Sequence, residues 1–492
     1  MEVHVTLTTL ALFVIIFIVF LVGLLFYLYP AGKSSSIPGP NPSDAVEGNI
    51  SDIRKTGSLQ EYLSELHSDY GEVTAFWHGT KTIVSVSNVE HFAPRSQVFE
   101  IPEVLFEGWR PMIGDSSFIF CKGLDIFSRR DQFEFKVDTK TKQYYGNLFT
   151  KISKELVQKW SSLPEGQHVP LTQHLKGFAT KAVCRMLLGD YFKDDVKVIK
   201  LHRAWEHCWT YIESLGGDKG PVSLEKDFKK NLSELTKILE EALEERFKNQ
   251  KGEPVILDGI LNSSESSSIP EKQLVCDAIS QLTIGLIVTH SVLMWVVYFV
   301  ATHSEVQNKL RKDLRKNENL EIMPETIGKI RYLQDVIKES VRCGSIFSWI
   351  GRKQDIDITI GGHIVPKDTP VIEAIGEAMQ DENLFSDPSL FDPGRFSAQD
   401  KDEGKKINPL AHIPFAFGGS RKNPENSLVY LLAAILVCNI TRELKIGIAG
   451  DSAQNLSDPD YSSFVSIPSK EELWATVSLA GKSATEAIGK KE

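Results

Sequence analysis

The most constraining feature of this chain is a long apolar run near its N-terminus. No charged residue occurs from Val5 to Tyr29, and Ala11–Leu28 is almost purely apolar. About 20 apolar residues are enough for a helix to cross the hydrocarbon core of a bilayer. Glu2 precedes the run, where a secretory signal has basic residues, and no A-x-A cleavage site follows it. We therefore predict an uncleaved anchor that places residues 5–29 in a lipid bilayer.

The residues after this run predict its orientation and the domain order. Lys33, Arg54 and Lys55 are the first lysine and arginine residues beyond it, and such residues favour the cytosolic side. We expect a single-pass protein whose body faces the cytosol. Ser34–Ser43 is rich in proline and cannot extend the helix. The predicted organisation is an N-terminal membrane anchor (1–30), a proline-rich hinge (31–50), one large domain (51–480) and a polar C-terminal tail (481–492).

Composition narrows the class of protein. The chain has 492 residues, of which 42% are hydrophobic and 24% are charged, as in ordinary globular proteins. A net charge of -10 argues against nucleic acid as a partner. The six cysteines stand singly, with no CxxC pair and no zinc-ligand spacing. This pattern fits a reducing compartment and argues against a disulfide scaffold.

Helical patterns dominate the body of the chain, with strands in two places. Ser58–Ser68 starts at a serine cap and spaces its apolar residues along one helix face, and Gln143–Phe247 is mostly helical. Glu72–Ser87 alternates around Gly79 as a β-hairpin, and short alternating strands return in Ile356–Ile375. We predict a mostly α fold with a smaller β region (α+β), in which these distant strands meet in one sheet.

One long segment allows two interpretations. Ala278–His303 carries no Asp, Glu, Lys or Arg, so it fits either a second transmembrane span or a helix buried in the core. Asp277 and Glu305 flank it closely. The polar residues spread through it are Gln281, Thr283, Thr289, His290 and Ser291. We favour the buried helix, because core helices of large domains are also apolar on all sides.

Three charged residues indicate a tertiary contact. Glu339 and Arg342 are three apart on a predicted helix, a spacing that usually gives a weak, solvated surface pair. Arg395 follows further along, in the sequence FDPGRF. Arginine binds a carboxylate through two parallel hydrogen bonds. If both arginines share Glu339, they fix the helix to the downstream segment.

Together these motifs resemble a known family. In motif order and spacing, Tyr332–Phe396 is similar to the K-helix, sheet and meander of the cytochrome P-450 superfamily, with its E-x-x-R motif at Glu339 and Arg342. The anchor, the hinge and the stretch from Trp295 to the sequence HSEVQ at His303–Gln307 extend the likeness over nearly the whole chain. The sequences LYPAGKSSSIPG, GSLQEYLSELHSDYG, QHVPLTQHLKGFA and RYLQDVIKESVR resemble the animal family twenty, which has no well-established substrate to transfer.

This resemblance implies a cytochrome P-450-like fold with an N-terminal transmembrane helix in the endoplasmic reticulum membrane. The implied activity is that of a haem-dependent monooxygenase, an oxidoreductase that incorporates molecular oxygen into a small hydrophobic ligand. Haem is the implied cofactor, with electrons from NADPH through NADPH–cytochrome reductase as a partner. Glu339, Arg342 and Arg395 correspond to the structural ion-pair triad of the superfamily.

The haem-ligand loop departs from the family pattern. Family members hold the haem iron with a cysteine thiolate, which favours O–O cleavage. The matching loop is PFAFGGSRKNPENSL, and alignment on Gly419 and Arg421 puts Asn423 at the cysteine position and Glu425 at the last glycine. Gly419 and Arg421 are expected to contact the haem, Arg421 through a propionate. Asn423 takes the expected metal-ligand position, but its neutral amide is not a competent thiolate.

Other residues could supply the remaining haem contacts. Cys438 would lie roughly 20 Å beyond Asn423 in a helix, at ~1.5 Å rise per residue, so it cannot replace the thiolate. His412 precedes the loop, and imidazole is a good iron ligand, but we expect a structural role for it. No clear W-x-x-x-R motif marks the second propionate anchor, for which Arg129 and Arg130 are the candidates.

The oxygen-activation segment departs from the family pattern as well. Typical members carry an acid and an alcohol side by side in the central helix. Alignment from Trp295 puts Ile287 at the acid position and Val288 at the alcohol position. Proton delivery needs a hydroxyl or an ionisable relay, so Thr289 and His290 remain as the candidate catalytic residues.

Two functions stay open. The first is a membrane-bound haem monooxygenase-like oxidoreductase with a degenerate ligand loop and oxygen-activation segment. The alternative is a non-catalytic or haem-free binding or scaffold protein on the same fold, and a haem with different axial ligation lies between the two. No dinucleotide, P-loop, zinc-protease or serine-hydrolase motif supports another chemistry.

Overall fold

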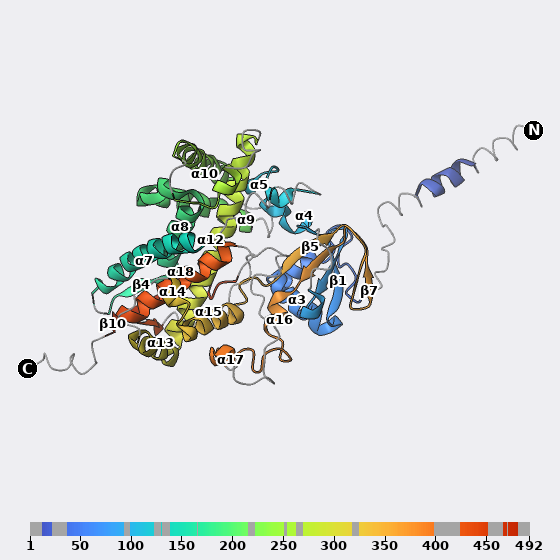
Figure 1. Ribbon diagram of the computed structural model, residues 1–492. Helices are drawn as coiled ribbons and strands as arrows, with labels where there is room; N and C mark the ends of the chain where they lie inside the picture. The colour runs from blue at the N-terminus through green and yellow to red at the C-terminus, as the bar shows by residue number, and fades with distance from the viewer. Residues whose placement is uncertain are drawn as a thin grey trace, which may run out of the picture.

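Figure 1 shows the computed structural model of the chain. The structure describes residues 12–21, 37–92, 99–122, 129, 138–164, 166–214, 222–249, 253–261, 269–316, 324–397, 424–450, 466–469 and 471–480. Within the first of these ranges lies a short apolar helix, Leu12–Leu21, whose side chains are exposed.

Helices make up most of the described chain. The α-helices are α2 (Ile50–Thr56), α3 (Leu59–Tyr70), α4 (Glu103–Phe106), α5 (Arg110–Ile113), α7 (Thr139–Ser161), α8 (Leu171–Leu188), α9 (Asp195–Ser214), α10 (Val222–Lys248), α11 (Asp258–Leu261), α12 (Glu271–Thr302), α13 (Ser304–Lys316), α14 (Pro324–Ile327), α15 (Arg331–Cys343), α16 (Ile375–Met379), α17 (Gly394–Ser397) and α18 (Pro424–Glu443). The 3-10 helices are η1 (Val89–His91), η2 (Glu107–Trp109), η3 (Phe118–Phe120) and η4 (Gly189–Lys193).

The strands form three sheets, of which the largest joins distant parts of the chain. They are β1 (Val73–His78), β2 (Lys81–Val86), β3 (Phe99–Glu100), β4 (His168–Pro170), β5 (Ile350–Gln354), β6 (Ile358–Ile360), β7 (His363–Val365), β8 (Pro370–Glu373), β9 (Leu444–Ile448) and β10 (Trp474–Leu479). The five-stranded sheet has the order β1-β2-β8-β5-β3, and β4-β10-β9 and β6-β7 form the smaller sheets. In the first sheet β1 and β2 pair antiparallel, and β8 joins β2 in parallel with Val371 opposite Val84. The predicted meeting of the hairpin with the later strands is confirmed.

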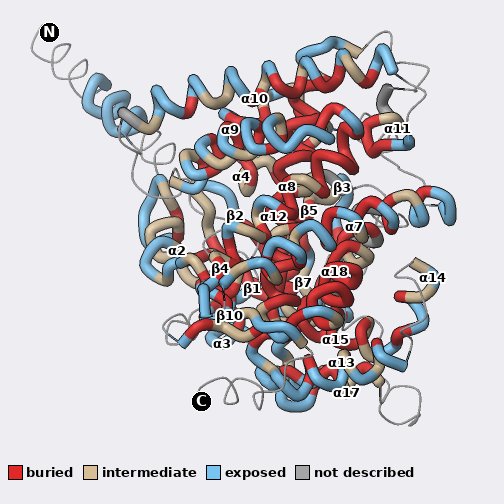
Figure 2. The backbone as a smooth tube through the Cα atoms, turned by 90° about the vertical axis from the view of Figure 1, so that its left-hand side faces the viewer, coloured by how far each residue is buried: buried red, intermediate tan, exposed pale blue. Residues whose placement is uncertain are grey.

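Helix α12 runs through the middle of the helical part, where Figure 2 shows its residues largely buried. It packs against α8, α15 and α18, and Val292, Leu293 and Met294 are fully buried. Among the helices that the structure describes, α12 alone is long and apolar enough to cross a membrane, a property that buried core helices share. The buried-helix interpretation of Ala278–His303 is confirmed.

The second half of the predicted hinge packs against the sheet. The carbonyl of Pro38 accepts a hydrogen bond from the Ala75 N–H at 2.8 Å. Gly39 lies so close to β1 that a Cβ at this position would come within 1.8 Å of the Ala75 carbonyl oxygen. Asn49 is buried and accepts a hydrogen bond from the Trp77 N–H at 2.8 Å. These contacts attach the chain after Ile37 to the folded body.

Candidate functional site

Helices α15 and α17 bring the three predicted charged residues together. Arg342 donates from Nε to Glu339 Oε2 at 2.8 Å and from Nη2 to Oε1 at 2.9 Å. Arg395 donates from Nε to the same Oε1 atom at 2.8 Å. The side chains of Glu339 and Arg342 are 0% exposed and that of Arg395 is 8% exposed. One buried carboxylate is therefore shared by two guanidinium groups.

Backbone groups form further hydrogen bonds with the side chains of this triad. Arg342 donates to the carbonyls of Met379 at 2.8 Å and Pro388 at 2.7 Å. The Asp392 N–H donates to Glu339 Oε1 at 3.0 Å. A buried ion pair needs such additional hydrogen bonds, because burial removes the water that would otherwise solvate the charges. The triad attaches α15 to the segment from Met379 to Arg395.

The candidate relay Thr289 lies midway along α12. One turn earlier Gly285 faces α8, where a Cβ would come within 3.0 Å of the Val183 side chain. Thr289 is fully buried, and its hydroxyl has no hydrogen-bond partner among the described residues. A threonine inside a helix commonly donates to the carbonyl of the preceding turn. An unsatisfied buried hydroxyl costs roughly 1–3 kcal/mol, so a polar ligand atom in contact with the Thr289 hydroxyl would be stabilising.

The residues just before Thr289 add no proton relay. Ile287 and Val288 are each 5% exposed and apolar. The family's acid–alcohol pair therefore has no ionisable counterpart at these two positions. Thr289 provides the hydroxyl that is nearest in sequence.

His290 faces α8. Its ring hydrogen-bonds the backbone of Thr172, and its Nε2 atom is buried without a described partner. Burial lowers the pKa of His290 to about 3, and the positive charge of Lys176 adds to the effect. The imidazole therefore stays neutral at physiological pH and is a poor proton donor. A catalytic role for His290 remains a prediction.

Arg129 binds a carboxylate of the chain itself. Its Nη2 atom donates to Asp277 of α12 and to the Ser116 carbonyl, and its Nη1 atom lies 2.7 Å from the sulfur of Cys121. Asp277 also accepts a hydrogen bond from the Phe118 N–H at 2.8 Å. Burial raises the pKa of Asp277 to about 6, although the positive charge of Arg129 lowers it in part. A contact between Arg129 and a haem propionate stays a prediction.

Several predicted haem-contact residues lie outside the described residues. They are Arg130, a candidate propionate anchor; His412, which precedes the haem-ligand loop; and Gly419, Arg421 and Asn423 of that loop. Helix α18 begins at Pro424, the residue that follows the predicted ligand position. Its Cys438 is fully buried, and burial raises the pKa of this thiol to about 12. Cys438 is thus a protonated core thiol.

A comparison with known protein families shows to which family the chain belongs. The family model described as cytochrome P450 matches residues 38–421. The chain belongs to the cytochrome P450 family. Cytochrome P450 20A1 of Rattus norvegicus is 33% identical over 479 residues, which cover 95% of this chain and 98% of the relative. Cytochrome P450 20A1 of Homo sapiens is 31% identical over 475 residues, with the same two coverages.

A solved P450 structure shares the fold. The structure described as retinoic acid bound cyanobacterial CYP120A1 superposes with a TM-score of 0.75 at 19% sequence identity, covering 90% of this chain and 100% of that chain. The predicted α+β P450 fold and the resemblance to family twenty are confirmed. The P450 family supports a haem-dependent, monooxygenase-like oxidoreductase supplied with electrons by a redox partner.

No cysteine lies between Cys343 and Cys438, so the loop that aligns with the family's haem-ligand loop contains no thiol. All six cysteines are free and lie among the described residues. Burial raises the pKa values of Cys208 and Cys438 to about 12, so these sulfurs stay protonated. The place of Asn423 at the ligand position remains a prediction, and an amide there cannot act as a thiolate.

The sequence did not predict another buried carboxylate, Glu373. Glu373 of β8 is 4% exposed and pairs with Arg352 of β5, with Oε1 2.8 Å from the Nε atom. Its Oε2 atom has no hydrogen-bond partner among the described residues. Burial raises the pKa of Glu373 to about 7, although Arg352 opposes the shift. The sequence feature that could have predicted this buried carboxylate is a glutamate inside the otherwise apolar strand PVIE.

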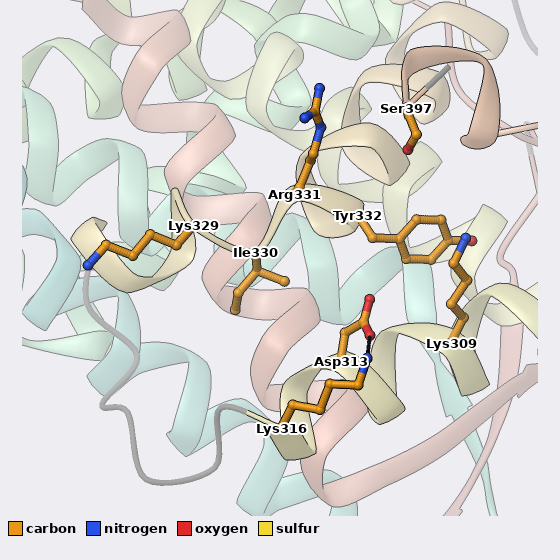
Figure 3. A pocket seen from close by; sticks show the side chains of 8 residues that line it. All are labelled: Lys309, Asp313, Lys316, Lys329, Ile330, Arg331, Tyr332 and Ser397. Atoms are coloured by element: carbon orange, nitrogen blue, oxygen red, sulfur yellow. Dashed lines mark hydrogen bonds and ion pairs between the residues drawn. The ribbon is translucent and has the colours of Figure 1, made fainter. Parts of the chain in front are cut away.

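A hollow of about 340 Å³ lies between α13 and α15 (Figure 3). Its lining residues are Lys309, Asp313, Lys316, Lys329, Ile330, Arg331, Tyr332 and Ser397. Lys316 pairs with Asp313 at 2.9 Å, and the Lys309 ammonium lies 3.6 Å from the centre of the Tyr332 ring. Four cationic side chains against one carboxylate make the hollow positively charged. It contains none of the candidate catalytic residues.

Proposed function

We propose that this chain is a membrane-bound oxidoreductase of the cytochrome P450 family in which standard thiolate-driven oxygen activation is weakened or lost. Three aligned positions carry the proposal: Asn423 stands at the cysteine position, and the apolar Ile287 and Val288 stand at the acid and alcohol positions. The nearby Thr289 hydroxyl is buried and has no hydrogen-bond partner among the described residues, so a polar ligand atom in contact with it would satisfy it. The apolar neighbours suit a small hydrophobic substrate.

The residues on α12 limit proton transfer. Thr289 offers one hydroxyl, whereas Ile287 and Val288 offer no ionisable group. A positioned acid or base contributes roughly 10²–10⁴-fold to the rate of a step that moves a proton. We therefore propose turnover slower than that of family members with the acid–alcohol pair.

The alternative is a haem-free or non-catalytic binding protein on the same fold. Asn423 at the thiolate position favours it, as do the protonated buried thiols of Cys208 and Cys438. In that case the Thr289 hydroxyl would serve ligand binding alone.

The proposal includes a membrane anchor and a reductase as the electron-supplying partner. Residues 5–29 would cross the endoplasmic reticulum membrane once and leave the body in the cytosol, and the exposed apolar helix Leu12–Leu21 supports this placement. Electrons would come from NADPH through a reductase. The positive hollow between α13 and α15 is a suitable surface for an acidic partner.

Reductase-supported NADPH oxidation by the purified full-length protein tests the proposal. We expect slow oxidation in the parent and faster oxidation in Ile287→Glu, which restores an acid at the family's acid position, two residues before Thr289 on α12. Glutamine has the shape of glutamate without its charge, so Ile287→Gln is the matched control. It should oxidise NADPH at the rate of the parent. Haem-free protein without any NADPH oxidation would instead support the binding-protein alternative.

A further inference from the structure

The hollow between α13 and α15 collects cationic side chains from three places in the chain (Figure 3). Lys309 and Lys316 lie on α13, Lys329 lies between α14 and α15, and Arg331 is the first residue of α15. Asp313 is the one carboxylate among the described lining residues, and it pairs with Lys316. Four cations and one carboxylate leave the described lining with a net charge of +3.

The other polar groups of the hollow do not cancel this charge. The Lys309 ammonium lies 3.6 Å from the centre of the Tyr332 ring, a contact that positions the ammonium and leaves it charged. The Ser397 hydroxyl donates to Asp335, a buried carboxylate that is not part of the lining. Even if the charge of Asp335 is included, positive charge remains in excess.

The N-terminal end of α15 adds a second feature that favours an anion. Ile330, Arg331 and Tyr332 line the hollow, and they are the N-cap residue and the first two residues of this 13-residue helix. Ile330 has an apolar side chain and makes no capping hydrogen bond. The N–H groups at the start of a helix carry partial positive charge and bind anions such as phosphate. The hollow therefore combines a cluster of cations with a helix N-terminus that has no side-chain cap.

We propose that the hollow binds a small ligand through a phosphate group, as a phosphate monoester or a diphosphate. A phosphate monoester carries about two negative charges at physiological pH, so it matches the excess of cations better than a single carboxylate does. The volume of about 340 Å³ falls within the roughly 300–1,000 Å³ of small-molecule sites. The inference goes beyond the proposed function and does not depend on it. A ligand bound here would also occupy the surface that an acidic protein partner would use.

Calorimetric titration of the full-length protein with inorganic diphosphate, in nanodiscs of neutral lipid, tests this site. Physiological salt screens non-specific attraction, so saturable binding under these conditions reports a site. The double variant Lys309→Gln, Lys329→Gln removes two cations and should weaken diphosphate binding about tenfold. The double variant Lys309→Arg, Lys329→Arg keeps both charges and should bind diphosphate nearly as the parent does.

A charge-matched control separates the site from the net charge of the protein. The double variant Lys229→Gln, Lys248→Gln removes two exposed lysines of α10 and should bind diphosphate like the parent. If the glutamine variant of the hollow fails to fold, Lys329→Gln alone provides the comparison, because Lys329 is exposed.

Nanodiscs of different lipid composition identify the source of the phosphate. Phosphatidic acid carries a phosphate monoester, whereas phosphatidylserine is anionic without one. Loss of diphosphate binding with phosphatidic acid alone would assign the hollow to a lipid headgroup, and unchanged binding with both lipids would assign it to a soluble phosphate ester. Either result supports the site. Parent-like affinity in the glutamine variant, an equal loss in the α10 variant, or no diphosphate binding by the parent would overturn the inference, and the last result would leave the hollow to an acidic protein partner.

Discussion

Replacing Glu339 by glutamine tests how far the buried triad holds the fold together. Glu339 Oε1 accepts hydrogen bonds from Arg342, from Arg395 and from the Asp392 N–H, and Oε2 accepts one from Arg342. Glutamine keeps the size of the side chain but removes the charge and turns an NH₂ group toward a guanidinium. Since the Arg342 side chain is 0% exposed, water cannot replace the lost carboxylate.

The expected loss is large. Removing one partner of a buried ion pair costs about 3–5 kcal/mol, because the other charge stays buried and unpaired. That is a substantial part of the roughly 5–15 kcal/mol that stabilises a typical protein. Urea denaturation followed by tryptophan fluorescence measures the change. Glu244→Gln is the matched control, because Glu244 pairs with Lys248 on an exposed face of α10. If Glu339→Gln unfolds at the same urea concentration as Glu244→Gln, the triad does not stabilise the fold as described.

Three further predictions follow from buried groups and from the anchor. Burial raises the pKa of Glu373 from 4.5 to about 7, so the parent should lose stability as pH rises between these values, and Glu373→Gln should lack that loss in urea denaturation. Equal pH slopes would refute it. Thr289→Val removes a hydroxyl that has no partner among the described residues, so the free energy of unfolding should stay unchanged or rise by about 1 kcal/mol in thermal denaturation. A clear loss of stability would reveal a partner for the hydroxyl. Deletion of residues 1–30 should give protein that is extractable without detergent, whereas continued integration in the membrane would contradict the core position of α12.

Features with a local pattern were predictable from the sequence. Ser58 at the start of α3 accepts a hydrogen bond from the Glu61 N–H, as its place before an apolar helix face suggests. The uncharged length of α12 predicted a buried helix, because its scattered polar residues disfavour lipid. The spacing of Glu339 and Arg342 with the FDPGRF sequence predicted a shared carboxylate because this set of motifs is specific.

Contacts between distant residues were not predictable in the same way. Arg129 and Asp277 form an ion pair although they are far apart in the sequence, and no sequence motif links them. The contacts of the Trp109 ring with Phe106 and Trp209 depend in the same manner on how α4, η2 and α9 are placed together. The packing of Pro38 on β1 was missed because a proline-rich stretch reads as a free connector until its backbone partner is known.

The absorption spectrum of the reduced, CO-bound protein tests the central claim most directly. The parent and Asn423→Cys are purified in parallel and compared after reduction and addition of CO. If Asn423 stands at the thiolate position, the cysteine variant gains a thiolate-type Soret band that the parent lacks. A thiolate-type band in the parent, or its absence from both proteins despite bound haem, would contradict the placement of Asn423 and with it the proposed loss of thiolate chemistry.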